Sequence, residues 1–152
     1  MGEPDSIGEI LEFAIAREME ANQFYMALAE QLENPAMREL VLEFAKEELE
    51  HKAKLELEVL KIGKVLRPVG KRAEFKVADY IVDFGIESDL GYKDLLIVAI
   101  EKEKKSLRLY IDLAAIIEDK DSRETLLSIA EEEAKHEVLF EIEYDEVKLR
   151  EN

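Results

Sequence analysis

The chain of 152 residues contains no cysteine. It can therefore form no disulfide, carry out no thiolate chemistry and build no metal site from thiolates, and a cytoplasmic location is expected. Proline and glycine are also scarce, at three and six residues, so long uninterrupted elements are possible. No stretch of the sequence approaches the roughly twenty apolar residues that span a membrane.

Basic residues are outnumbered, with 21 Lys and Arg against 37 Asp and Glu, which gives a net charge of -16. Such a charge argues against nucleic acid and anionic membranes as partners, and it is compatible with attracting cations. The acidic segment 1–5 lacks the basic and apolar parts of a signal peptide, so none is expected. With 47% apolar and 38% charged residues, the composition is typical of one soluble, helix-rich domain covering residues 1–152.

The two histidines each close the same short motif, Glu-x-x-His, and the two motifs lie 85 residues apart. Further residues repeat at the same distance, which gives the pairs Glu18 and Glu103, Tyr25 and Tyr110, Glu48 and Glu133, and His51 and His136. Lone motifs of this kind are usually contacts on a helix surface. Here four carboxylates and two imidazoles repeat together, which is the ligand set of a two-metal site inside a helix bundle.

Apolar residues spaced three and four apart predict helices, and the candidate ligands fall on their apolar faces. The first helix is expected to begin at Ser6, which with Glu9 reads as a capping box. Its buried face should contain Leu11, Ala14, Glu18, Ala21, Tyr25, Leu28 and Leu32. The second helix should run from about Pro35, after Asn34 as its N-cap, to about Ile62 before Gly63. Its buried face should contain Met37, Val41, Phe44, Glu48, His51, Leu55, Val59 and Ile62.

A long connection separates the two halves of the chain. It contains a basic stretch, 64–76, and an expected short helix from Val77 to Phe84, and it allows the second and third helices to run parallel. The buried face of the third helix should contain Leu96, Ala99, Glu103, Ser106, Tyr110, Leu113 and Ile117. The fourth helix should run from about Ser122 to Leu149, with Leu126, Ile129, Glu133, His136, Phe140 and Tyr144 inward. The expected fold is all-α, a four-helix bundle of two αα-hairpins with a long crossover.

Four carboxylates in one buried layer are strongly unfavourable unless cations compensate them, and no lysine or arginine shares their helix faces. Two divalent ions would neutralise the layer; Glu with His suits iron and manganese, and zinc is also tolerated. The repeat assigns Glu18, Glu48 and His51 to one ion and Glu103, Glu133 and His136 to the other, with Glu48 and Glu133 as bridges. Glu47 and Glu132 are interpreted as solvent-side neighbours of these ligands.

Two tyrosines accompany the candidate ligands. Tyr25 and Tyr110 lie two turns beyond Glu18 and Glu103 on the same helix faces. One interpretation is a phenol that donates a hydrogen bond to a ligand carboxylate or acts as a local electron source. The alternative is a core tyrosine whose hydroxyl has some other partner.

At these residues the sequence resembles the ferritin-like superfamily and, within it, the rubrerythrin-like diiron proteins. The resemblance is carried by residues 14–25, 44–51, 99–110 and 130–136, and it implies two iron ions that react with hydrogen peroxide or dioxygen. Rubrerythrins take electrons from a rubredoxin-like module. This cysteine-free chain lacks that module, so its electrons are expected from a separate protein. Rubrerythrins also carry an extra glutamate one turn after the third-helix ligand, where this chain has Ser106.

Three functions remain open from the sequence. The first is a diiron oxidoreductase that reduces peroxide or dioxygen, as in defence against oxidative stress, with a rubredoxin-like protein as donor. The second is a ferroxidase or iron-storage protein, and the third is a non-catalytic bundle that holds a metal such as zinc. A homodimer is also expected.

Overall fold

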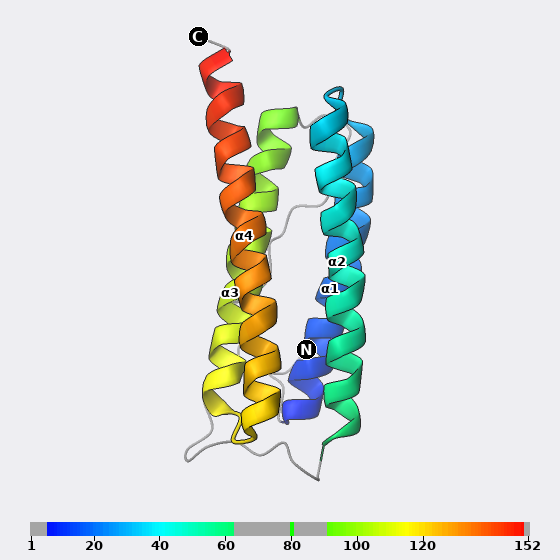
Figure 1. Ribbon diagram of the computed structural model, residues 1–152, viewed down its shortest axis with the longest axis vertical. Helices are drawn as coiled ribbons and strands as arrows, with labels where there is room; N and C mark the ends of the chain where they lie inside the picture. Colours follow the sequence, from blue (N-terminus) through cyan, green and yellow to red (C-terminus); the bar gives the residue numbers. More distant parts are fainter. Residues whose placement is uncertain (1–5, 63–79, 81–90, 151–152) are drawn as a thin grey trace.

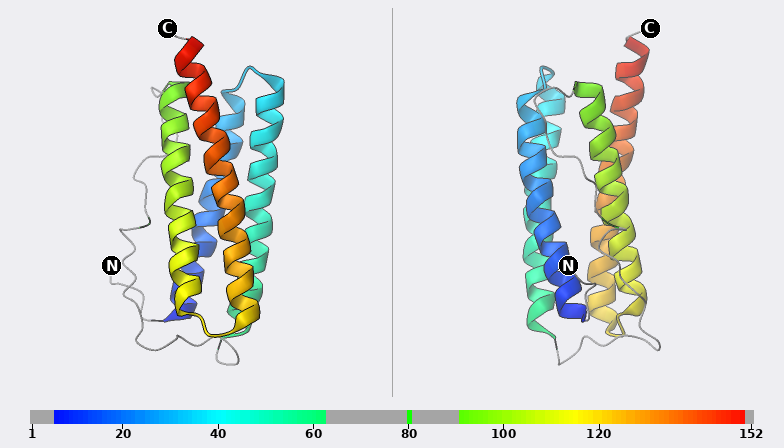
Figure 2. Two further views of the ribbon diagram at one scale, coloured as in Figure 1. Left: turned by 60° about the vertical axis from the view of Figure 1, so that its left-hand side comes forward. Right: turned by 180° about the vertical axis from the view of Figure 1, so that it is seen from behind.

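The computed structural model describes residues 6–62, 80 and 91–150, and within them the chain forms an all-α bundle. Its helices are α1 (Ile7–Glu30), α2 (Pro35–Leu60), α3 (Tyr92–Ile116) and α4 (Lys120–Arg150). α1 packs antiparallel to α2, and α3 packs antiparallel to α4, so that two αα-hairpins lie side by side (Figures 1 and 2). α2 and α3 run in the same direction (Figure 1). The predicted four-helix bundle of two hairpins is therefore confirmed.

Side-chain caps fix the beginnings of the first two helices as the sequence predicts. Ser6 is the N-cap of α1, and its Oγ accepts a hydrogen bond of 3.2 Å from the Glu9 N–H. Asn34 is the N-cap of α2, and its Oδ1 accepts bonds of 2.9 and 3.2 Å from the N–H groups of Ala36 and Met37. These bonds satisfy donors that the first helical turn leaves without a carbonyl partner.

The predicted boundaries are wrong at two places. α4 begins at Lys120 rather than Ser122, because Asp119 Oδ2 accepts a 2.9 Å hydrogen bond from the Ser122 N–H and takes the capping role. α2 ends at Leu60, so Ile62 lies beyond the helix and is 41% exposed. The buried position near this end is Glu58, with Val59 only partly buried.

Some predictions lie outside the described residues. They concern Gly63 as the end of the second helix, the basic stretch 64–76 and the short helix from Val77 to Phe84, of which only Tyr80 is described. Tyr80 is buried, and its hydroxyl donates a 2.8 Å hydrogen bond to Asp112 Oδ2 on α3.

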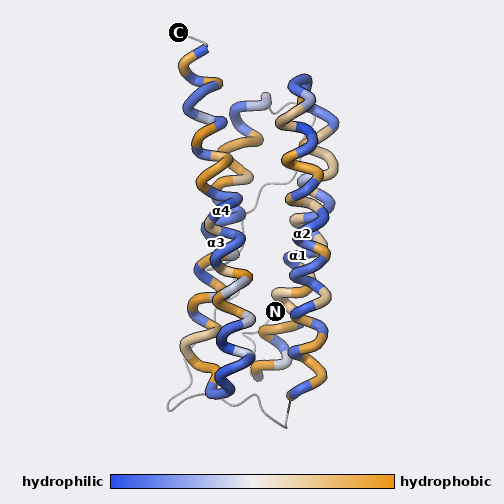
Figure 3. Tube along the Cα trace, in the orientation of Figure 1, coloured by the Kyte–Doolittle hydropathy of each residue, from blue (hydrophilic) through white to orange (hydrophobic). Residues whose placement is uncertain are grey.

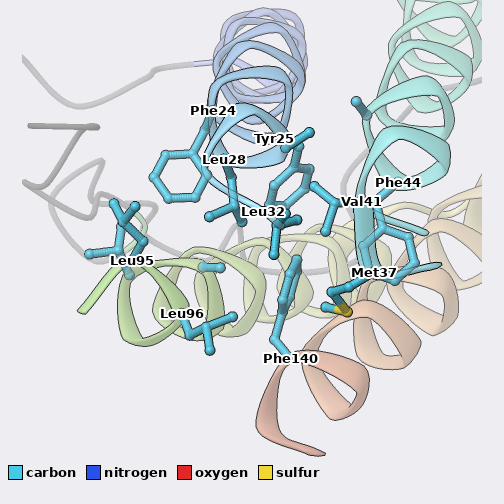
Figure 4. Packing of buried hydrophobic residues seen from close by; sticks show 14 of the residues in the cluster. Phe24, Tyr25, Leu28, Leu32, Met37, Val41, Phe44, Leu95, Leu96 and Phe140 are labelled. Atoms are coloured by element: carbon cyan, nitrogen blue, oxygen red, sulfur yellow. The ribbon is translucent and has the colours of Figure 1, made fainter. Parts of the chain in front are cut away.

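Apolar side chains fill both ends of the bundle. Polar and apolar residues alternate along every helix, which is the pattern of amphipathic helices packed around a core (Figure 3). One core cluster includes Leu11, Leu55, Tyr110 and Ile129, and the other includes Phe24, Tyr25, Phe44, Leu96 and Phe140 (Figure 4). On each helix a short polar stretch separates the residues of the two clusters. The bundle therefore has a buried polar layer at mid-height.

Within the described residues, no helix combines the length and the apolarity that a membrane span requires.

Candidate metal centre

The polar layer brings together all six predicted ligands. They form two groups in which the candidate ligand atoms lie within 4.8 Å of one another: Glu18, Glu48, His51 and Glu133 in one, and Glu48, Glu103, Glu133 and His136 in the other. All six side chains are at most 2% exposed. Glu48 and Glu133 belong to both groups, as the repeat predicts for two bridging carboxylates.

Both imidazoles direct Nδ1 at the carboxylates. His51 Nδ1 lies 3.4 Å from Glu18 Oε1, 3.3 Å from Glu48 Oε1 and 3.2 Å from Glu133 Oε1. His136 Nδ1 lies 3.4 Å from Glu103 Oε2, 3.6 Å from Glu48 Oε1 and 3.8 Å from Glu133 Oε1. The two rings are nearly parallel, with centroids 6.5 Å apart. The arrangement follows the pseudo-twofold symmetry of the sequence repeat.

The inward atoms of this layer have no hydrogen-bond partners. They are both oxygens of Glu48 and of Glu133, Oε1 of Glu18, Oε2 of Glu103, and Nδ1 of His51 and of His136. Leaving such atoms unpaired in a protein interior is costly. Oxygen and imidazole nitrogen donors that converge from four helices fit a pair of divalent cations, which would satisfy the atoms and offset the charge.

The two basic side chains that directly precede Glu18 and Glu103 in the sequence are engaged elsewhere. Arg17 donates hydrogen bonds of 2.8 Å to Ser106 Oγ and 3.2 Å to the Lys102 carbonyl. Lys102 pairs with Glu20 and lies over the ring of Phe24. Neither therefore supplies a counter-charge inside the cluster.

Without metal, the cluster would retain protons. Burial raises the pKa of Glu48 well above its ordinary value, and the charges of Glu133 and Glu18 raise it further. Burial and the charges of Glu103 and Glu18 raise the pKa of Glu133 to about 7. Burial alone would lower the pKa of His51 and His136, but the glutamates that lie close around both rings outweigh it and raise both. Metal binding would displace these protons.

The two tyrosines reach across the bundle to the opposite hairpin. Tyr25 donates a hydrogen bond to Glu103 Oε1, and Tyr110 donates one to Glu18 Oε2. Burial and the neighbouring carboxylates raise the pKa of each phenol well above its ordinary value, so both stay protonated as donors. Of the two interpretations left open by the sequence, the hydrogen bond to a candidate ligand carboxylate is the one that the structure contains, while a catalytic role for these phenols stays a prediction.

Glu47 and Glu132 contribute more than the sequence interpretation allowed. Their side chains are 27% and 35% exposed, as expected of solvent-side neighbours. However, Glu132 contacts His51 Nε2, and Glu47 Oε1 lies 3.5 Å from His136 Nε2. Burial would raise the pKa of Glu132, but the hydrogen bond to His51 outweighs it and lowers that pKa. The sequence contained a signal for this role, because these two residues also lie 85 apart and each directly precedes a candidate ligand glutamate.

Comparisons with known proteins agree with this geometry. A hypothetical protein from Pyrococcus furiosus has a similar solved structure, with 24% identity and a TM-score of 0.73 over 93% of this chain and 89% of that one. At this identity the likeness shows the fold alone. Among curated proteins, none matches the sequence significantly. The Rubrerythrin family model matches residues 9–144. Because that match spans nearly all of the chain and all six clustered side chains, the protein belongs to the rubrerythrin family.

Proposed function

We propose that this protein is a diiron oxidoreductase that reduces hydrogen peroxide or dioxygen with electrons from a separate donor. The observation that carries the proposal is the pair of buried Glu and His groups that share Glu48 and Glu133, in a chain of the rubrerythrin family. One iron ion would be held by Glu18, Glu48 and His51, and the other by Glu103, Glu133 and His136. Manganese and zinc fit the same donors and are the competing metals.

A bound iron pair would supply reducing equivalents and Lewis acidity. The protein's own contribution is orientation. Each phenol holds one oxygen of a carboxylate, Oε1 of Glu103 or Oε2 of Glu18, and the second oxygen of that carboxylate has no partner. The free oxygens are therefore the ones available to a metal. Ligands fixed before the metal arrives need little reorganisation when the charge of the metal changes.

Burial is the second contribution of the protein. The six clustered side chains and both tyrosines are almost fully inaccessible, and apolar clusters lie at either end of the layer. In such an environment charges interact more strongly than in water, and competing hydrolysis is suppressed.

We further propose that a small oxidant reaches this layer and that a rubredoxin-like protein supplies the electrons, because the chain has no cysteine for an iron site of that type.

The proposal is tested with protein purified without oxygen and loaded with Fe(II). Elemental analysis should give about two iron ions per chain, and stopped-flow spectra with peroxide and a reductant should show repeated bleaching and recovery of an oxidised-iron band. Glu48→Ala, which removes a shared ligand, is the inactive control. Peroxide consumption no faster than that of an equal amount of free iron would exclude the oxidoreductase function.

Ferroxidase or iron-storage activity is the second candidate, and one observation favours it. Ser106, which accepts a hydrogen bond from Arg17, occupies the position where rubrerythrins carry an additional glutamate. Without that carboxylate, the site has one ligand fewer that could bind or release a metal ion when the oxidation state of the ion changes. Native mass spectrometry separates the alternatives. A homodimer, which we propose here, argues against a storage shell, whereas a large closed oligomer would support it.

A further inference from the structure

The two ring nitrogens of each histidine in the candidate metal centre face different groups. Nδ1 faces the carboxylate cluster, whereas Nε2 faces a glutamate from the opposite hairpin, namely Glu132 for His51 and Glu47 for His136. An ionised carboxylate only accepts hydrogen bonds, so it keeps the imidazole proton on Nε2. When a metal displaces the proton on Nδ1, the Nδ1 lone pair can bind the ion, as in other sites where a carboxylate orients a ligand histidine.

The two histidines differ in the surroundings of Nε2. Glu132 is within hydrogen-bonding distance of His51 Nε2, whereas His136 Nε2 is buried without a hydrogen-bond partner, 3.5 Å from Glu47. The His136 ring instead stacks on Phe44, with centroids 4.0 Å apart and planes at 26°. The residue equivalent to Phe44 in the second half is Ile129, which offers no ring for stacking. One histidine is therefore oriented by a hydrogen bond and the other by an aromatic contact.

We propose that Glu132 is a positioning residue that holds His51 ready for metal, so that the position containing His51 binds the first divalent ion. The position containing His136 fills second, because its ring must still gain a partner for Nε2 when Nδ1 becomes a ligand. The inference rests on the proposed metal site and adds an order of occupation to it. It also gives a role to the cross-hairpin contact, which joins α2 of one hairpin to α4 of the other.

A zinc titration followed by ¹⁵N NMR tests this order of binding directly. The chain has only two histidines, so protein labelled with ¹⁵N at histidine gives two imidazole signal sets, and a His136→Asn variant assigns the set of His51. In the unsubstituted protein the first equivalent of zinc should shift Nδ1 of His51 and leave its Nε2 protonated. The second equivalent should shift Nδ1 of His136.

Variants of α4 separate orientation from charge. Glu132→Ala should weaken binding of the first zinc about 10- to 100-fold, the range for lost partners of ligand histidines, and abolish the preference for His51. Glu132→Gln, which keeps an acceptor oxygen, should restore part of that affinity. Glu131→Ala is the matched control, because it removes the same charge from a neighbouring side chain that is 73% exposed. It should change affinity by no more than about twofold. Circular dichroism should show that all variants are equally helical.

Two results would overturn the inference. One is a Glu132→Ala variant that binds the first zinc as tightly as Glu131→Ala does, and the other is a His136 signal that shifts before that of His51. A protein that binds neither zinc nor Fe(II) at all would instead reject the metal site, and with it the proposed function.

Discussion

The glutamates of the polar layer differ in how they can contribute to metal binding, because only some of them accept a hydrogen bond from a tyrosine. Glu48 and Glu133 have no hydrogen-bond donor on either oxygen and belong to both ligand groups. Glu18 and Glu103 each have one oxygen occupied by a tyrosine and belong to one group only. Removing a shared carboxylate should therefore disturb both metal positions, whereas removing an unshared one should disturb mainly its own.

Metal content of single variants tests this division. Glu48→Ala should reduce bound metal from about two ions per chain to well below one, whereas Glu18→Ala should retain about one ion. The double variant Glu18→Ala and Glu103→Ala should bind almost none. Elemental analysis after gel filtration measures the content, and Glu50→Ala, at an exposed position in the same helix turn, is the control. Equal losses in Glu48→Ala and Glu18→Ala would contradict the assignment of Glu48 as a shared ligand.

Helices begin and end where local side-chain chemistry favours it, and α2 shows this most clearly. Pro35 begins the helix, and the Asn34 side chain accepts hydrogen bonds from two N–H groups of its first turn. α4 shows the limit of local reasoning. The periodicity predicts a start at about Ser122, but the Asp119 side chain caps the helix three residues earlier, and the Ser122 side chain is buried. Apolar periodicity alone therefore does not identify the first residue of this helix.

The contribution of the α2 cap can be measured in the metal-free protein. Asn34→Ala should lower the free energy of unfolding by about 1 kcal/mol, the usual cost of losing such a cap. That loss corresponds to a Tm lower by roughly 2–4 °C in a domain of this size. Thermal unfolding followed by circular dichroism gives both values. Glu33→Ala, at the exposed preceding residue, should leave Tm nearly unchanged. A similar Tm in both variants would show that Asn34 does not stabilise the helix.

The bundle as a whole combines two stabilising apolar clusters with a polar layer that destabilises it in the absence of cations. The pKa of Glu133 is about 7 in the folded protein, and those of Glu48, His51 and His136 are also raised. Groups with raised folded pKa values bind protons more tightly in the folded state than in the unfolded state. Their effect is to make the metal-free protein less stable as pH rises.

This linkage gives opposite pH dependences with and without metal. The metal-free protein should lose stability as pH rises from about 5, above the ordinary pKa of Glu, to about 8, above the folded pKa of Glu133. The metal-loaded protein should gain stability over the same range, because deprotonated ligands bind the ions more tightly. Calorimetric unfolding in chelator and in excess Mn(II) measures both trends. A metal-free Tm that rises over this interval would contradict the cluster of raised pKa values.

The regular periodicity of the sequence and its 85-residue repeat were sufficient to predict the helices, most of their buried faces and the six clustered side chains, but not the end of α2, where Ile62 is exposed and Glu58 is buried. These features are readable because a helix places residues three and four apart on one face whatever surrounds it. The side-chain contacts between the two hairpins could not be predicted from the sequence. Tyr25 meets Glu103, Tyr110 meets Glu18, and Glu132 meets His51 only because the two hairpins pack in one particular register. That register results from many small contacts in both apolar clusters, so no single sequence motif predicts it.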